Sequence, residues 1–242
     1  VHINCCNANA PRAFAMIPRV TYRVPNKDRI DVNLYMPSQA ILQIGKRTFT
    51  LTQQTGYPAS NEVKITVTPD KTTQANIALR IPGWTPNATV KVNGETMKGV
   101  ASGEYYVINR QWNAGDEITL TMEMPAHLVS LNQSVAIERG PIVYARDSRF
   151  NDGFVDEVVT IPNKDGIIQM KTEENGKDMW ITVSVPMVRG TYNDASTDTR
   201  HIRLCDFASA GSTWDERIRY RVWLPKLYTP DNPKSGQFQG YW

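Results

Sequence analysis

The chain has 242 residues, enough for one large or two modest domains, and its 40% hydrophobic and 21% charged residues describe an ordinary globular protein. The net charge of +3 comes without a basic run, so nothing in the sequence indicates a nucleic-acid partner. No apolar stretch approaches the length of a membrane span, and the three cysteines, an odd number, do not form a disulfide framework.

Two adjacent cysteines, Cys5 and Cys6, stand near the start of the chain. Their Cα atoms lie about 3.8 Å apart, closer than the usual disulfide span, so a bond between them would be strained. Two neighbouring thiolates can instead bind one soft metal such as zinc, or one of them can be held beside the metal as a nucleophile. Burial as two small apolar residues is the alternative. A zinc site wants four ligands, and only His2 stands upstream to help.

Residues 7–23 form the only convincing helical stretch, because apolar residues such as Phe14 and Ile17 recur at helical spacing. Pro11 fits the first turn, whereas Pro18 should kink or restart the helix. The helix has an apolar face without a helical partner downstream. This suggests that the chain is part of a longer protein.

From about residue 30 the pattern changes to short strands and turns. Apolar and polar residues alternate in 30–35 and 62–68, and Asn93-Gly94 after residues 90–92 predicts a hairpin. Further strands are predicted at 76–81, 88–92, 104–109, 117–123 and 135–144. Strands at a spacing of about ten residues without intervening helices favour a β-sandwich.

The final third repeats this pattern less regularly, with strands predicted at 157–161, 166–171, 179–185, 200–206 and 217–224. Residues 191–199 indicate a polar loop, and the end from Pro225 is expected to lie over a surface. A domain boundary is expected within 146–155. We therefore predict a β-sandwich over residues 25–148 and a second β module, or a continuation of the sandwich, over 149–242.

The sequence lacks a phosphate-binding glycine loop, a dinucleotide fingerprint and a nucleophile elbow. His127 and His201 are interpreted as ordinary strand residues. Trp84, Trp112 and Trp223 could stack on sugars, but we expect them to fill cores and strand ends. No pair of carboxylates can be placed across a glycosidic bond from sequence alone. The acidic candidates are Glu104, Asp116, Glu117, Glu123, Glu138, Asp156 and Glu157.

Several segments carry a family resemblance when they are taken together and in order. They are Cys5-Cys6 with Asn9 and Arg12, then residues 79–84, 90–94, 106–116, 135–144 and 221–225. Together they resemble the bacterial β-L-arabinofuranosidase-like glycoside hydrolases of family 127, over most of the chain.

The resemblance implies a mainly β chain, in which one or two β-sandwich (jelly-roll-like) modules follow an (α/α)6-barrel catalytic domain. Residues 1–24 would be the end of that barrel. Cys5 would be the nucleophile and a zinc ligand, and Cys6 a second zinc ligand. A Glu and a further Cys from earlier sequence would complete the site, and a different Glu would be the acid/base.

Two features depart from the family pattern. The upstream Glu-x-Cys ligands and the acid/base Glu have no counterpart here, and residues 7–11 differ from the Pro-rich version. The resemblance therefore predicts a C-terminal fragment of a retaining glycoside hydrolase that acts on arabinofuranosides or related plant or glycoprotein glycans. Zinc would bind in the full-length parent, and this chain alone would be inactive and metal-poor.

The expected partner is a carbohydrate substrate, reached through the missing catalytic domain, with neither nucleic acid nor membrane. The alternative function is a non-catalytic carbohydrate-binding or adhesion-type β-sandwich module with incidental cysteines. An isolated zinc-binding structural protein would need more ligands than this chain offers. The sequence allows a periplasmic or a cytoplasmic location.

Overall fold

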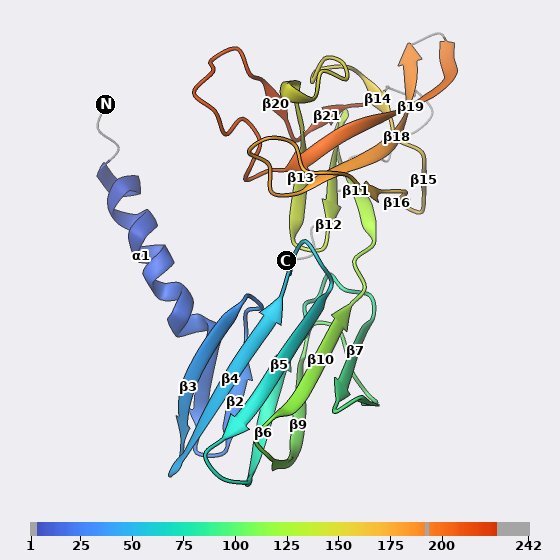
Figure 1. Cartoon of the computed structure of the whole chain (residues 1–242). Helices are drawn as coiled ribbons and strands as arrows, with labels where there is room; N and C mark the ends of the chain where they lie inside the picture. Colours follow the sequence, from blue (N-terminus) through green and yellow to red (C-terminus); the bar gives the residue numbers. More distant parts are fainter. Residues whose placement is uncertain (1–3, 192–193, 227–242) are drawn as a thin grey trace. The chain divides into compact units, whose positions relative to one another are not determined.

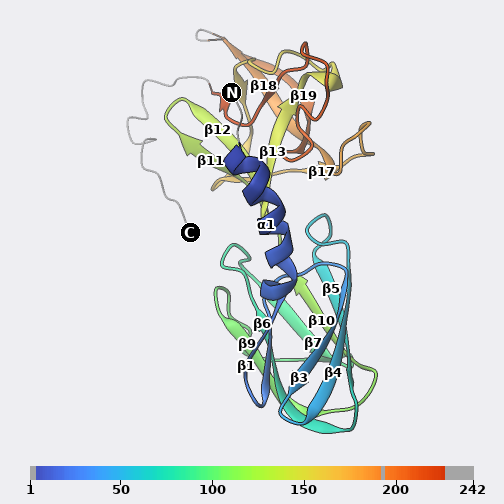
Figure 2. The same cartoon turned by 90° about the vertical axis from the view of Figure 1, so that its left-hand side faces the viewer.

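A computed structural model describes residues 4–191 and 194–226 (Figure 1). The predicted helix is α1 (Asn4–Thr21), which continues through Pro18 and leads into the first strand (Figure 2). In the rest of the described chain the only helix is the short 3-10 turn η1 (Ser148–Phe150). The prediction of a mainly β protein is confirmed. Among the described residues, no helix is long and apolar enough to cross a membrane.

The chain divides into two compact units, Val1–Glu123 and Met124–Trp242. The first unit contains two sheets. The four-stranded sheet has the order β1 (Tyr22–Asn26), β2 (Arg29–Val32), β6 (Thr73–Arg80) and β9 (Tyr105–Trp112). The six-stranded sheet has the order β3 (Ser38–Ile44), β4 (Arg47–Thr55), β5 (Glu62–Pro69), β10 (Asp116–Met122), β7 (Ala88–Val92) and β8 (Glu95–Thr96). Neighbouring strands are antiparallel except β2 and β6, which are parallel.

Both sheets bury their inner side chains in one shared core, which is the arrangement of a β-sandwich. Strand β5 shows why the sequence folds this way, because its burial alternates and places Val63, Ile65 and Val67 inside. Asn93 and Gly94 join β7 to β8 with φ values of 51° and 85°. The hairpin predicted from Asn-Gly is therefore confirmed.

The second unit is built on a sheet of many short strands around two long ones. Its main path has the order β14 (Val159–Thr160), β18 (Thr182–Thr191), β19 (Asp194–Asp206), β13 (Ile142–Asp147), β12 (Ser134–Arg139), β11 (Ala126–Leu131), β16 (Ile167–Ile168) and β15 (Asn163–Lys164). Off this path, β17 (Lys171–Thr172) pairs with β18, β20 (Tyr220–Arg221) with β13, and β21 (Leu224–Pro225) with β12. A second core, with Ile137, Val183 and Leu204 among its members, belongs to this unit alone.

In place of the strands predicted over 166–171 and 217–224 the structure has pairs of two-residue strands, β16 and β17 for the first and β20 and β21 for the second. Two further predicted elements need correction. The single strand predicted over 135–144 is two strands, β12 and β13, because the chain turns at Gly140 with φ 59°. The polar loop predicted over 191–199 falls largely within strands, since β18 runs to Thr191 and β19 begins at Asp194, with Thr191 opposite Asp194. Backbone pairing, which does not require an apolar side, extends this hairpin.

The structural division of the chain lies between Glu123 and Met124, whereas the sequence placed it after residue 148. Pairing explains the difference. Strands β12 and β13 pair with β19, β20 and β21 from the end of the chain, and Ile137 and Tyr144 lie in the second core. Of the segment predicted to lie over a surface, Pro225 is in β21, and residues 227–242 lie outside the described residues.

Candidate functional site

The cysteine pair lies at the start of α1, where Cys5 and Cys6 are consecutive helical residues. His2 lies outside the described residues. Among the residues that the structure describes, no three potential His, Cys, Asp or Glu ligands come together.

Helix α1 exposes its apolar residues. Along residues 9–20 every side chain is exposed apart from the half-buried Ile17. Phe14 is 71% exposed, and Met16 and Val20 are exposed as well. In proteins an amphipathic helix gains most of its stability by packing its apolar face. The residues predicted to end a helical barrel therefore form a helix with an uncovered apolar face.

The histidines fit the interpretation as strand residues. His127 lies opposite Glu138 in the β11–β12 pair, with 3.5 Å between Nε2 and Oε2. His201 is exposed on β19.

Most of the acidic candidates have local partners. Asp116 accepts from Asn93 Nδ2 and from the backbone of Asn113, both at 2.9 Å. Glu123 accepts from Asn87 Nδ2 at 2.6 Å. These contacts support turns and strand ends.

The predicted roles of the tryptophans are confirmed in part. Trp112 is fully buried, and its Nε1 donates to the Ala75 carbonyl at 3.1 Å, while Trp84 packs against the first core from a half-buried position. Trp223 is 36% exposed, so the expectation that it is largely buried is wrong. It lies between the short strands β20 and β21.

The second unit contains a cavity of about 420 Å³. The cavity is lined by residues from three segments of the chain, 149–150, 174–179 and 213–218, and by Arg203 of β19. Phe150, Met179 and Ile218 supply apolar surface. Its charged groups are three cations and three carboxylates, namely Arg149, Lys177, Arg203, Glu174, Asp178 and Asp215. The volume is in the range of small-ligand sites, roughly 300–1,000 Å³.

A buried carboxylate, Asp206, joins two of the cavity loops. Its Oδ1 accepts from the backbone N–H of Ile181 at 2.9 Å, and Oδ2 accepts from that of Ser209 at 3.0 Å. The Ser209 hydroxyl also contacts Asp206, and it accepts from the backbone N–H of Trp180 at 3.0 Å. The segment before β18 and the loop after β19 are therefore held together at a common point.

Asp147 provides a second buried connection. It accepts from Arg149 Nη2 at 2.8 Å and from the backbone N–H of Gly211 at 2.8 Å, and Arg149 Nη2 donates in turn to the Ser209 carbonyl at 2.7 Å. Burial acts to raise the pKa of Asp147, but the hydrogen bonds from Arg149 and Gly211 outweigh it and hold the pKa below its ordinary value. The carboxylate is therefore ionised and ties residues 147–150 to the loop after β19.

Three charged side chains, Arg146, Arg200 and Glu157, form a cluster that holds the segment after η1 in place. Arg146 is fully buried and donates from Nη2 to Glu157 at 3.2 Å, and Arg200 also donates to Glu157. Gly153, with φ 129°, passes close to this cluster, and a Cβ there would lie 2.7 Å from Arg146 Nη2. Only glycine fits this position.

Exposed aromatic side chains stand next to the cavity lining in the sequence. Trp214, between the lining residues Thr213 and Asp215, is 99% exposed, and Trp180, which follows Met179, is 50% exposed. Sequence analysis did not single out either tryptophan or the cavity. A tryptophan among the turn residues of 211–215 was the available signal, because polar loops rarely need a large aromatic side chain.

Comparison with known proteins relates both units to glycoside hydrolases. Residues 29–124 match the family model of the β-L-arabinofuranosidase GH127 middle domain. The solved structure of a GH127 β-L-arabinofuranosidase from Geobacillus stearothermophilus T6 aligns with 92% of this chain at a TM-score of 0.74 and 26% identity. A second solved GH127 β-arabinofuranosidase gives the same three values. A third structure, described as a glycoside hydrolase, shares the fold over 93% of the chain at 22% identity and a TM-score of 0.71. No curated protein matches the sequence significantly.

The fold and these comparisons define a glycoside-hydrolase-like β protein. The resemblance to the GH127 β-L-arabinofuranosidases, indicated by the ordered sequence motifs, is confirmed. The chain spans 37%, 38% and 40% of the lengths of the three solved structures.

Proposed function

We propose that this chain is the β-sandwich portion of a glycoside hydrolase that acts on arabinofuranosides or related plant or glycoprotein glycans. The observation that carries the proposal is the match of both units, in order, to GH127 β-L-arabinofuranosidases over 92% of the chain. The family-model match over residues 29–124 supports the same assignment from sequence. The hydrolytic reaction would take place in a helical barrel outside residues 1–242.

Helix α1 is the element that would connect the two parts. The exposed apolar side chains Phe14, Met16 and Val20 would pack against barrel helices, and this packing would stabilise α1. Cys5 and Cys6 would then enter the barrel from the first turns of α1. In this arrangement Cys5 is the nucleophile toward the anomeric carbon, and both cysteines are zinc ligands.

The donor set of this chain limits what it can do alone. Zinc in proteins takes four ligands at structural sites and three protein ligands at catalytic sites, whereas this chain offers two thiolates. Bound zinc would keep a thiol ionised at neutral pH. The acid/base carboxyl and the enclosing pocket that glycoside hydrolysis requires would also come from the barrel. We therefore expect the 242-residue chain to bind zinc weakly and to lack hydrolase activity.

The test compares this chain with a longer protein that includes the barrel. Both are assayed on a chromogenic β-L-arabinofuranoside and on related pentosides and hexosides, with zinc content measured alongside. The longer protein should hydrolyse a glycoside and contain zinc, and its Cys5→Ser variant should lose turnover. Cys205→Ala is the matched control, because Cys205 is buried in the second unit and should not affect chemistry.

Turnover by the 242-residue chain, or a fully active Cys5→Ser variant, would refute the role given to Cys5. Activity of the longer protein on another glycoside, with none on arabinofuranosides, would retain the hydrolase and change its substrate.

A further inference from the structure

We propose that the cavity of the second unit, whose lining residues adjoin the exposed Trp214 and Trp180 in the sequence, is a binding site for a neutral oligosaccharide. The inference concerns residues 149–218 only and does not depend on hydrolysis. The choice of sugar probes below rests on the proposed function.

The charge of the lining favours a neutral, hydroxyl-rich ligand. Three cations and three carboxylates balance within a cavity of about 420 Å³, so neither an anion nor a cation gains from the overall charge. Arginine and lysine provide donors and carboxylates provide acceptors, and a sugar hydroxyl can use both. Asp147 already engages Arg149, which lowers its attraction for an anionic ligand.

Apolar side chains contribute little open surface to the cavity wall itself. Phe150 and Met179 line it but are only 6% and 8% exposed, and the Arg203 guanidinium lies 5.0 Å from the centroid of the Phe150 ring, so the open aromatic faces belong to the neighbouring tryptophans. Aromatic faces pack on the C–H faces of sugars, and exposed tryptophans combine a large apolar face with a polar N–H. Trp214 is exposed over 99% of its surface, so both faces of its ring are open to a ligand.

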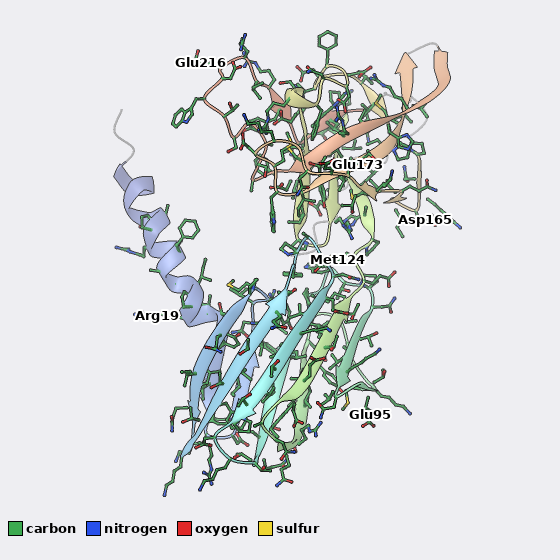
Figure 3. The ribbon with its side chains drawn as sticks, in the orientation of Figure 1. Arg19, Glu95, Met124, Asp165, Glu173 and Glu216 are labelled. Atoms are coloured by element: carbon green, nitrogen blue, oxygen red, sulfur yellow. The ribbon has the colours of Figure 1, made fainter. Side chains whose placement is uncertain are left out.

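Buried charges hold the walls of this cavity in place before a ligand arrives. Asp206 joins Ile181 and Ser209, and Asp147 joins Arg149 and Gly211. Figure 3 shows Glu216 on the loop that follows β19 and projects from the sheet. Because loops fixed in advance lose less conformational freedom on binding, this network favours affinity. It also gives a functional reason for burying two carboxylates at the ends of strands.

In the experiment, the 242-residue chain is titrated with a neutral arabino-oligosaccharide, a neutral galacto-oligosaccharide and an anionic oligogalacturonide. Calorimetry and tryptophan fluorescence measure the binding of each. At least one neutral sugar should bind and change the fluorescence, and the oligogalacturonide should bind more weakly. Trp214→Ala should weaken binding about tenfold through loss of the stacking face. Its fold should be unaffected, because the removed side chain is almost wholly exposed.

Two further variants locate the site. Asp178→Asn removes one lining carboxylate while keeping a residue that tolerates the observed φ of 59°, and it should also weaken binding. Phe154→Ala is the matched control: its ring is 84% exposed in the same unit, but neither Phe154 nor its sequence neighbours line the cavity, so affinity should not change.

Failure of all three sugars to bind would overturn the proposal, as would tighter binding of the oligogalacturonide. Equal binding by Trp214→Ala and wild type, or a loss confined to Phe154→Ala, would place any sugar site elsewhere and also overturn it. If Trp214→Ala changes the oligomeric state and sugars do not bind, the exposed ring belongs to a protein contact. None of these outcomes bears on hydrolysis by the longer protein.

Discussion

Asp147 shows how a single buried carboxylate can matter for the second unit. Its pKa is lowered because hydrogen bonds from Arg149 and Gly211 outweigh the effect of burial. A lowered pKa in the folded state means that the stabilisation is fully present above the unfolded carboxyl pKa of about 4 and is lost as pH falls through the lower folded value. At neutral pH the ionised Asp147 carboxylate therefore stabilises the loop after β19.

We expect Asp147→Asn to destabilise the second unit near neutral pH and to make its stability less dependent on pH below about 4. Thermal unfolding at a series of pH values measures both effects. Asp156→Asn is the control, because Asp156 is a largely exposed carboxylate paired with Arg221 and exposed pairs contribute little. If stability falls equally steeply with decreasing pH in wild type and in Asp147→Asn, the stabilising role given to the Asp147 carboxylate is contradicted.

Truncation of the neighbouring Asp206 side chain should destabilise the second unit more than Asp147→Asn does. Asp206→Ala leaves the backbone N–H groups of Ile181 and Ser209 without their buried acceptor, at a cost of about 3 kcal/mol in the free energy of unfolding. Ser209→Ala removes only the hydroxyl and should cost about 1 kcal/mol. Denaturant unfolding of the two variants decides the point, and similar values for both would show that the carboxylate is not the main connection.

Cys205 is expected to be chemically inert in the folded chain. It is buried against Phe150 and Met179, and burial, with the negative charges of Asp147 and Asp206, raises the pKa of its thiol to about 12. Because the thiolate is the reactive form, iodoacetamide near pH 8 should leave Cys205 unmodified in the native chain and modify it after unfolding. Peptide mass spectrometry reads the site, and rapid native labelling of Cys205 would be inconsistent with its burial.

At the scale of the elements, Trp112 should be the most costly tryptophan to remove from the first unit. Its ring is fully buried at the end of β9 and its N–H is bonded to the Ala75 carbonyl. Trp112→Ala should lower the free energy of unfolding of the first unit by about 3–5 kcal/mol, and Trp84→Ala, which removes a half-buried ring from the same core, should lower it by clearly less. Chemical unfolding of both variants provides the comparison, and equal losses would contradict the difference in burial.

Local patterns predicted several strands of the first unit but not β1, β3 or β4. Strand β7 has the predicted bounds 88–92, and the alternation in 62–68 became β5, because one face of each strand lies on a core. In the second unit, strands as short as β14 or β20 have two residues each, too few to create a readable alternation. The break at Gly140 was readable locally, because the Gly140-Pro141 dipeptide is a turn signal.

The two candidate sites differ in how far sequence could reveal them. The adjacent Cys5 and Cys6 are visible without a structure, because thiol chemistry is local to the pair. The cavity is assembled from residues 149–150, 174–179 and 213–218 by buried hydrogen bonds of Asp147 and Asp206. Nothing in the spacing of these segments specifies that they meet, since the contact depends on the order of strands β18, β19 and β13 in the sheet.

For the whole molecule, each unit has its own hydrophobic core. The first core draws its members from residues 22–122, and the second draws its members from 126–224. A cut between Glu123 and Met124, shown at Met124 in Figure 3, separates no member of a core from its neighbours. Cores of this kind usually support independent folding.

We therefore expect residues 1–123 and 124–242, expressed separately, each to unfold cooperatively and with the midpoint of the corresponding transition in the intact chain. The control is a cut after residue 148, where the sequence had placed the boundary. That cut removes β11, β12 and β13 from the second unit, together with the core residues Ile137 and Tyr144, so residues 149–242 should not fold. Circular dichroism and amide-proton dispersion in NMR spectra measure the outcome. A folded 149–242 fragment would show that strands β11–β13 are not essential to the second core, and an unfolded 124–242 fragment would show that the second unit does not fold on its own.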